Sequence, residues 1–475
     1  MNVLALVLFL AYTVFVAILS WMATKKTKSA KSFSAGNGDM GMAVVVLSLA
    51  SSFTSAATLM AMPGYVYQAG LSGIIYFNIF QTAGLLVGLM VVGRKVRSSD
   101  MVETTTSIPQ WLRQHYNSKT IGHFFALQSV FLITFMVLVV MLMADMMSGV
   151  FKMDYSLAVV LTAVYVFAYS LVGGTYGHGW VGLVQSIIMI GIVIWIVFIS
   201  VPDAQAWNAF VPAILAEDKY YFSVVNPNSL IFQDYFTVFY CAFIMGFCNI
   251  FQPHIFSKAL YLKKGKSWSL TVVLSIVVIS IFNLILVMGM FIRAKVPGLT
   301  NLDTVMNYYI VNYLGKVAVA LMFVTVMAAA MSTLNGVIIG MCGNIGSDLI
   351  PEKTEAKKSL LYVRGIVAVV GVIVIVLALN PPDFLAVIGM WGYNILMASS
   401  FVPMICSLWF KKVSVVSVML SSVVSIVLFI GLMLSGITIN GAWACGWCIP
   451  ASIITALVSE LVIRMIHRSK VNSVQ

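Results

Sequence analysis

Long apolar runs recur along the whole chain and are separated by short polar connections. A helix of about 20 apolar residues spans the hydrocarbon core of a bilayer, so runs of that length predict transmembrane helices. The runs are continuous rather than alternating, which favours helices over the strands of a barrel. About thirteen spans are predicted in this way: residues 2–23, 41–66, 73–93, 120–150, 156–174, 180–201, 233–257, 268–293, 315–346, 360–379, 384–410, 413–435 and 442–466.

Composition supports an all-α integral membrane protein, because the mean hydropathy is +1.02 and charged residues make up only 9% of the chain. The longest polar connections, residues 94–119 and 202–232, are too short for a separate soluble domain. Within them, residues 107–119 predict an amphipathic interfacial helix and residues 202–232 predict an outer cap with short helices. The glycine-rich residues 171–180 predict a tight inner turn, with His178 in the loop.

Basic residues gather on alternate connections. If the N-terminus is outside, about 22 of the 27 Lys and Arg residues fall on the inner side, as the positive-inside rule requires. The net charge of +12 therefore follows from the membrane and does not indicate nucleic-acid binding. We expect a multi-pass protein of the cell membrane with its N-terminus outside and its C-terminus in the cytoplasm. The first run precedes its basic residues, and so is expected to remain as a helix rather than act as a signal peptide.

Two spans differ from the others because they mix small or polar residues with a proline. They contain SSFTSAATLMAMPG, residues 51–64, and GFCNIFQPHIFSK, residues 246–258. Helices broken at membrane depth are tolerated where the released backbone groups line a cavity. Pro63 lies toward the outer end of its span and Pro253 toward the inner end, which is the mirrored placement expected of an inverted repeat. The pattern predicts a transporter with two broken helices.

Other functional classes are less favoured. The sequence contains no zinc-ligand spacing, nucleotide-binding glycine loop or nucleophile elbow, so an enzyme is not expected. Cys445 and Cys448 form a CxxC that opens an apolar span, and packing is a better interpretation than redox chemistry. In the ninth span, MAAAMSTLNG (residues 327–336) has a composition that by itself favours close helix packing. A transporter-like sensor, a membrane enzyme and a channel remain as remote alternatives.

Several short patterns occur in a fixed order along the spans. They are the hydroxyl-rich segment that closes in MPG, the GG…W…Q pattern of Gly173, Gly174, Trp180 and Gln185, QPHI at 252–255, and AxxST at Ala329, Ser332 and Thr333. Together they resemble the sodium:solute symporter family, and most closely the branch with proline, pantothenate, monocarboxylate and sialic-acid permeases. The resemblance covers nearly the whole chain.

The resemblance implies a leucine-transporter-type fold with two inverted five-helix repeats. The repeats would occupy residues 36–205 and 206–411, between a peripheral first helix in 1–35 and peripheral last helices in 412–475. It also implies sodium-coupled symport of a small organic solute, such as an amino acid, an organic acid or a related nutrient, into the cell by alternating access. The expected partners are the solute, Na+ as coupling ion and the lipid bilayer, and a monomer should suffice for transport.

The family's common sodium site maps onto five residues of this chain. The resemblance implies backbone carbonyls from Ser51, Thr54 and Ala329, and hydroxyl oxygens from Ser332 and Thr333. Unwound helix turns supply such carbonyls, and neutral oxygens suit Na+. In sialic-acid-type members the solute touches hydroxyls that match Ser55 and Thr58. Further polar residues could face the same cavity or simply join helices through hydrogen bonds: Asn78, Gln81, Asn249, Trp391, Tyr393 and Asn394.

Three positions depart from the family pattern. Gly182 and Phe53 stand where members carry aspartates, so one sodium ion per solute is expected, and proton coupling stays open as an alternative. Asp145, in MADMM, stands where carboxylate-handling members carry an arginine. An acid inside a span is costly and normally has a partner or a task. Asp145 is therefore expected to pair with a cationic or zwitterionic solute, to carry a proton, or to lie solvated near the outer end.

Overall fold

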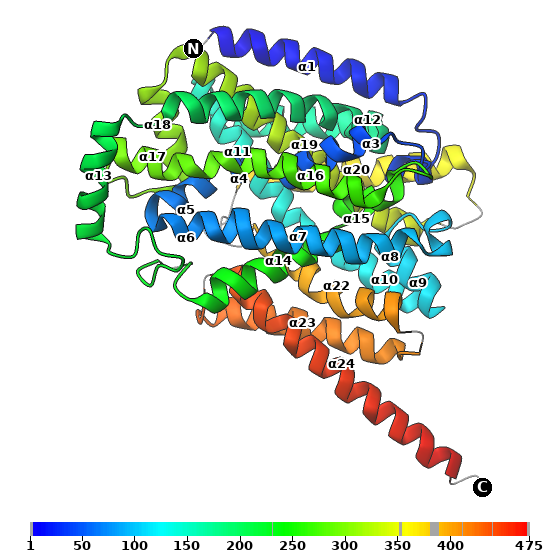
Figure 1. Ribbon diagram of the computed structural model, residues 1–475. Helices are drawn as coiled ribbons and strands as arrows, with labels where there is room; N and C mark the ends of the chain where they lie inside the picture. Colours follow the sequence, from blue (N-terminus) through cyan, green and yellow to red (C-terminus); the bar gives the residue numbers. More distant parts are fainter. Residues whose placement is uncertain are drawn as a thin grey trace.

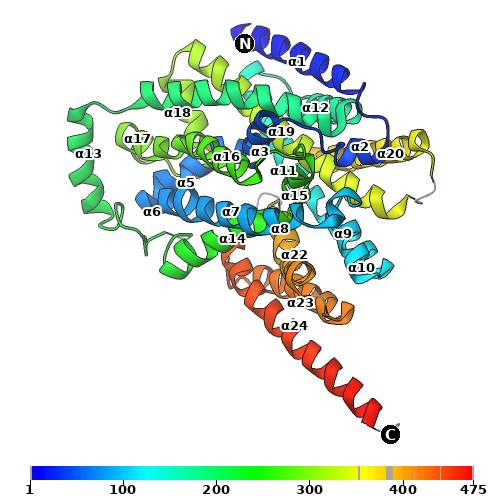
Figure 2. The same cartoon turned by 45° about the vertical axis from the view of Figure 1, so that its right-hand side comes forward.

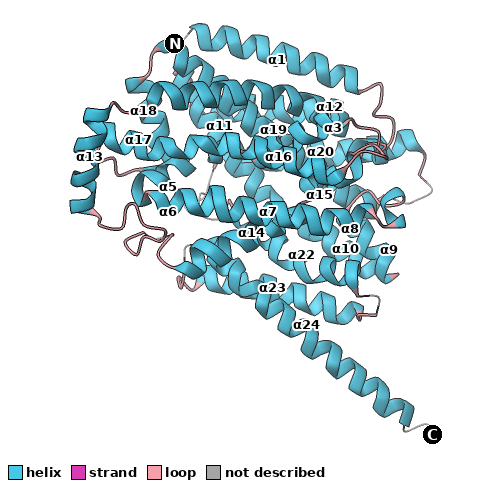
Figure 3. Ribbon diagram, in the orientation of Figure 1, coloured by secondary structure: helices cyan, strands magenta, loops and turns pink. Residues whose placement is uncertain are grey.

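The computed structural model describes residues 3–229, 231–350, 354–380, 389–410, 412–438 and 440–472. This part of the chain is helical, and its β-type pairing is limited to an isolated bridge between Met40 and Leu262 (Figure 3). Within these described residues, ten helices are long and apolar enough to cross a membrane, or twelve if each of two bent pairs counts as one span.

The spans are built from the following elements. They are α1 (Val3–Ala23); α3 (Met42–Phe53) with α4 (Ala56–Met60) and α5 (Met62–Ala69); α6 (Leu71–Ile74), η1 (Ile75–Gln81), α7 (Thr82–Gly88), η2 (Leu89–Gly93) and α8 (Arg94–Arg97); α10 (Lys119–Gln128), η4 (Ser129–Phe131) and α11 (Leu132–Phe151); α12 (Tyr155–Ser200); η5 (Phe236–Cys241), α14 (Ala242–Cys248), η6 (Asn249–Phe251) and α15 (Pro253–Tyr261); α16 (Trp268–Phe282), η7 (Asn283–Val287) and α17 (Met288–Lys295); α19 (Lys316–Leu349); α20 (Ala356–Leu379); α22 (Trp391–Trp409); α23 (Val415–Leu434); and α24 (Gly441–Asn472).

The helix α12 is long enough for two spans and contains one residue with a non-helical conformation, Gly174, at φ +53° and ψ −152°. A side chain at this position would meet Phe33, since a Cβ atom would lie 2.9 Å from its ring. The kink at Gly174 divides α12 into the fifth and sixth predicted spans. When the two halves of α12 are counted separately and each bent pair is counted as one span, the described residues contain the thirteen spans expected. The predicted start of the eleventh span, residue 384, lies outside the described residues.

The expected tight turn at residues 171–180 is present at a single residue, Gly174, whose non-helical conformation separates the two helical halves of α12. Helical structure continues on both sides of Gly174, so the change of direction needs one glycine rather than a loop. His178 consequently lies inside the second half of α12 and is buried, not in a loop. The neighbouring glycines serve helix packing instead: Gly173 and Gly177 lie against Ser20 of α1.

Short helices cover the ends of the bundle. They are α2 (Ala30–Ser34), η3 (Asp100–Glu103), α9 (Ile108–Tyr116), α13 (Ala204–Glu217), η8 (Leu302–Thr304) and α18 (Val305–Tyr313). The amphipathic helix predicted at 107–119 is present as α9, which buries Ile108, Trp111 and Leu112. The predicted cap over 202–232 contains α13.

The spans lie side by side around α19, which is the most buried of the long helices. In two views α1 lies along one edge of the bundle, whereas α23 and α24 lie along the opposite edge (Figures 1 and 2). The first and last helices are therefore at the periphery. The residue boundaries of the two repeats, 36–205 and 206–411, stay a prediction.

Several basic connections meet at one end of the bundle, on the right in Figure 1, which we call the basic end. Lys31 donates a hydrogen bond of 2.9 Å to the carbonyl of Glu103. Lys264 pairs with the Glu103 carboxylate, and its hydrogen bond and charge hold the pKa of that carboxyl below its ordinary value. The backbone of Met40 bonds to Tyr261 and Lys263, at 3.1 and 3.0 Å. The helices α13 and α18 lie at the opposite end.

Candidate ion and solute site

The second span is broken between α3 and α4, with a bend of 64°. Ser55 and Thr58 form a capping box: Thr58 Oγ1 accepts from the Ser55 amide at 3.3 Å, and Ser55 Oγ accepts from the Thr58 amide at 3.4 Å. In a continuous helix these two amides would serve the carbonyls four residues earlier, which are those of Ser51 and Thr54. The capping box therefore releases the two carbonyls that the family resemblance implies for sodium.

The proline is not the cause of this break. Pro63 lies in the first turn of α5, where its missing N–H costs nothing, and the helix continues past it. The break falls within the hydroxyl-rich part of the segment, at Thr54 and Ser55. In the seventh span the break does precede a proline, because Gln252 is extended before Pro253 and the helix bends by 58°.

The helix α19 presents its two hydroxyls to the broken turn. Ser332 Oγ donates to Ser51 Oγ at 2.9 Å, and Thr333 Oγ1 lies 3.3 Å from the Thr54 carbonyl and 3.1 Å from that of Ala329. All five residues are buried. Each α19 hydroxyl gives its hydrogen to another oxygen, which leaves its lone pairs available to a cation. The five residues predicted to hold sodium are therefore brought together by the fold.

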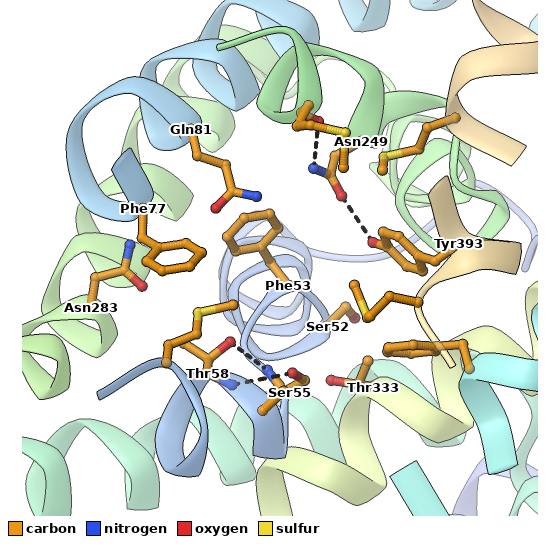
Figure 4. A pocket seen from close by; sticks show the side chains of 16 residues that line it. Ser52, Phe53, Ser55, Thr58, Phe77, Gln81, Asn249, Asn283, Thr333 and Tyr393 are labelled. Carbon is orange, nitrogen blue, oxygen red and sulfur yellow. Dashed lines mark hydrogen bonds between the residues drawn. The ribbon is translucent and has the colours of Figure 1, made fainter. Parts of the chain in front are cut away.

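A cavity adjoins the break, with a volume of about 670 Å³ when its solvent-filled space is included (Figure 4). Its walls come from both broken spans, from η1 and η7, and from α11, α19 and α22. It is lined by Ser52, Phe53, Ser55, Ala57, Thr58, Met62, Phe77, Gln81, Phe135, Met245, Asn249, Asn283, Thr333, Met390, Tyr393 and Met397. Thr333 belongs both to this lining and to the predicted sodium residues, so the two sites share a wall.

Five of the residues predicted for the solute line the cavity. Ser55 and Thr58 face it from the broken turn, and Gln81, Asn249 and Tyr393 face it from the opposite side (Figure 4). Asn249 is held in place, because its amide donates to the Met245 carbonyl at 2.8 Å and its oxygen accepts from Tyr393 at 2.9 Å.

Four other predicted residues are not brought to the cavity. Asn78 stands behind its wall and accepts a hydrogen bond of 3.3 Å from the lining residue Asn283. Trp391 packs against Phe429 of α23. Asn394 faces α24, where its amide lies close to Gly441. The register of α22 instead directs Met390, Tyr393 and Met397 into the cavity.

Asp145 is the fourth of these residues. It is exposed on α11, while its neighbours Met143, Ala144 and Met146 are buried. Because successive helical residues point in directions about 100° apart, this register turns Asp145 away from the bundle interior. The expectation that Asp145 lies in the solute site is not met, and its placement agrees with the solvated alternative.

The lining residues that the sequence did not reveal are mostly apolar. They include three phenylalanines and four methionines. Because the chain is so hydrophobic, its sequence does not distinguish such residues from lipid-facing ones. Ser52 belongs to the hydroxyl-rich run but was not singled out. It is hydrogen-bonded to His178 Nε2 at 3.0 Å, a contact that also gives the buried histidine a role in the structure.

The departures from the family pattern lie beside the same turn. A Cβ atom at Gly182 would come within 3.0 Å of Ser51 Oγ and 3.1 Å of Ser48 Cβ, so the glycine permits close contact between α12 and α3. Phe53 lines the solute cavity. Gly182 and Phe53 thus pack against their surroundings, and neither position supplies a carboxylate. At the third departure, Asp145 in MADMM replaces the arginine of carboxylate-handling members, so this stretch supplies no arginine to the cavity.

Comparison with known proteins agrees with these observations. The model of the sodium:solute symporter family matches residues 33–425. A sodium/pantothenate symporter of Haemophilus influenzae is 21% identical, over 92% of this chain and 91% of its own length. A sodium/proline symporter of Staphylococcus aureus is 22% identical, over 96% of this chain and 91% of its own.

The solved structure of a Na+-coupled sialic acid symporter, in a substrate-bound outward-open state, superposes with a TM-score of 0.76 at 14% identity, over 96% of this chain and 98% of that one. The likeness confirms the leucine-transporter-type fold. Because the family model covers most of the sequence, the chain belongs to the sodium:solute symporter family, a family of multi-pass membrane transporters that use Na+ as the coupling ion.

Proposed function

We propose that the chain moves a small organic solute into the cell together with Na+ by alternating access, and that Ser51, Thr54, Ala329, Ser332 and Thr333 hold the ion. The observation that carries this proposal is the capping box, which frees two carbonyls directly opposite two α19 hydroxyls. Hard cations prefer oxygen ligands. Neutral oxygens also hold the ion weakly enough for release on the far side.

Coupling between sodium and solute follows from the wall that the proposed ion site and the cavity share at Thr333. An ion at Thr54 and Thr333 orders the turn that carries Ser55 and Thr58, and these two residues line the solute cavity. Sodium therefore raises the affinity for solute, and by linkage the solute raises the affinity for sodium by the same factor. A sodium gradient can then drive the solute inward.

The solute we propose has no net charge, either because it is uncharged or because it is a zwitterion, and it has a compact apolar body. None of the described lining residues is charged. A net charge taken out of water without a partner is costly. The available polar groups are amides and hydroxyls, notably Gln81, Ser55 and Thr58, while phenylalanines and methionines make up much of the wall. A polyhydroxylated or multiply charged solute fits this lining poorly.

We propose that the basic end faces the cytoplasm, with the N-terminus outside and the C-terminus inside. The clustering of Lys31, Lys263 and Lys264 at that end supports this orientation. Impermeant thiol reagents applied to intact cells should label Lys219→Cys, in the outer cap, but not Lys266→Cys. The reverse pattern would overturn the orientation. All proposed site residues come from one chain, so we propose that a monomer suffices for transport.

The function is tested by the melting temperature of the detergent-purified protein in sodium, potassium or choline chloride, with a panel of neutral amino acids, organic acids, sialic acid and sugars. A ligand of the folded state at about 100 times its Kd stabilises by about 2.7 kcal/mol. We expect a rise specific to sodium, and a further rise with a neutral solute. Ser332→Ala should abolish both, whereas Ser435→Ala, at an exposed hydroxyl, should change neither. Equal melting in the three salts, with or without solutes, would refute the proposal.

A further inference from the structure

Lys258 is a cation enclosed by the protein. It lies in α15 and its side chain is fully buried, at 0% exposure. Its ammonium donates to Ser48 Oγ at 3.2 Å and lies 5.2 Å from the ring of Tyr261. Among the described residues, no aspartate or glutamate pairs with it. A buried cation without an acid is unfavourable, and membrane proteins retain such residues for function rather than stability.

The groups around Lys258 do not supply a negative charge. His178 on α12 and His254 on α15 lie close enough to interact with it electrostatically. Tyr261 is the aromatic partner, and Arg97 on α8 donates to the carbonyls of Ala259 and Leu262 next to it. Among the described residues, the groups found around the ammonium are therefore neutral or basic.

The position of Lys258 connects it to opening of the basic end. The helix α15 is the half of the broken seventh span that leads to the basic loop, and all of its residues are buried. Separation of α15 from α3 would break the bond between Lys258 and Ser48 and admit water to the ammonium. Exposure to water favours the ionised side chain, so Lys258 favours the open arrangement of this end.

The same turn of α3 connects Lys258 to the proposed ion site. The carbonyl of Ser48 accepts hydrogen bonds from Ser51 Oγ at 3.3 Å and from Ser52 Oγ at 2.6 Å. Ser51 Oγ in turn accepts from Ser332 Oγ, which is a proposed sodium ligand. An ion bound there adds a second positive charge to a region of low dielectric constant, where like charges repel strongly.

We propose that Lys258 couples sodium binding to opening of the basic end: its buried, unpaired charge destabilises the closed arrangement, and bound sodium increases this effect. The inference rests on the proposed sodium site and adds a residue that touches neither ion nor solute. Sodium bound from the opposite side then favours release of ion and solute toward the basic end. A closed state that is too stable would instead trap them.

The test compares Lys258→Met, which removes the charge but keeps an apolar side chain of similar length, with Lys258→Arg and with Lys266→Met at an exposed site of the adjacent loop. We expect Lys258→Met to raise the melting temperature by a few degrees. Its maximal rate of sodium-driven uptake in proteoliposomes should fall about tenfold, with an unchanged or lower sodium concentration for half-maximal rate. Lys258→Arg should keep most of the rate, and Lys266→Met should resemble the wild type.

Hydrogen exchange supplies a readout that a purely structural lysine would not change. In the wild type, sodium should speed exchange in the peptide that contains α15, and in Lys258→Met this acceleration should be lost. Ser48→Ala should lower the melting temperature when it is made in the wild type, because the Lys258 ammonium then loses its acceptor. The same substitution in the Lys258→Met background should not lower the melting temperature, because no ammonium is present there.

Other results would overturn the inference. A Lys258→Met protein that melts lower, fails to fold, or needs more sodium at an unchanged maximal rate would show that Lys258 supports the fold instead. These outcomes are distinct from failure of the proposed function, in which the wild type itself would show no response to sodium.

Discussion

At the scale of residues, the proposed ion site depends on which groups accept hydrogen bonds from two backbone amides. The amides of Ser55 and Thr58 bond to each other's hydroxyls, and the carbonyls of Ser51 and Thr54 are released as a result. Thr333 then connects the proposed ion site with the cavity, because its hydroxyl lies at the Thr54 carbonyl and its side chain lines the cavity.

Thr333→Ala removes an ion ligand without changing the charge of the site. The sodium concentration for half-maximal solute uptake should rise at least about tenfold, which corresponds to the loss of about 1.4 kcal/mol of binding free energy. Thr333→Ser should retain most of the affinity. Thr325→Ala, two turns away on the same helix, is the matched control, because its hydroxyl only bonds to the Leu321 carbonyl. Equal sodium dependence in Thr333→Ala and Thr325→Ala would remove Thr333 from the site.

Gln81→Glu tests the charge of the solute. The substitution keeps the shape of the side chain and adds an anion to a lining that otherwise lacks charge in its described residues. The KM for a neutral solute should rise about tenfold or more, since the anion is desolvated when the cavity fills. Gln68→Glu, at an exposed position of α5, should leave the KM unchanged. A lower KM in Gln81→Glu would instead indicate a cationic solute.

The fold brings the residues proposed for sodium together more completely than those proposed for the solute. Ser51, Thr54 and Ser332 belong to short motifs whose order along the spans is specific, and the fold brings them together. Asp145, Trp391 and Asn394 were chosen because they are polar within apolar spans. Polarity does not reveal which side of a helix faces a cavity, and a shift of one position is enough to turn a side chain away.

At the scale of elements, two broken helices organise the molecule, and each break has its own cause. In the seventh span Pro253 follows an extended Gln252, so the sequence predicted the break directly. In the second span the break arises from competition by serine and threonine hydroxyls for backbone amides. Pro63 lies in this broken span, but it does not cause the break. The turn expected at residues 171–180 needs only Gly174, and the loop expected around His178 is absent, because glycines that pack helices and glycines that form turns look the same in a sequence.

Gly174→Ala tests the kink that separates the fifth and sixth spans. Positive φ disfavours a Cβ atom, and strain of this kind costs about 1–3 kcal/mol. Contact with Phe33 adds to the cost. The melting temperature should therefore fall by several degrees. Gly191→Ala, on the same helix, has open space around the added methyl and should be neutral or slightly stabilising. Similar melting of the two variants would contradict the kink at Gly174.

At the scale of the whole molecule, the spans and the basic end could be predicted from apolar runs and from the distribution of Lys and Arg. Both patterns are summed over many residues, so an error at one position changes the prediction little. The cavity could not be predicted in this way, because Phe53, Phe135 and Met245 come from three different spans and resemble lipid-facing residues.

Coupled flux is the property of the whole molecule on which the account depends. The most direct test measures uptake of labelled sodium and labelled solute in parallel, in proteoliposomes that contain the purified protein. We predict that a sodium gradient concentrates the solute, that each flux requires the other, and that both are lost in Ser332→Ala but not in Ser435→Ala. Accumulation of solute without sodium, or a sodium flux that ignores the solute, would contradict the account.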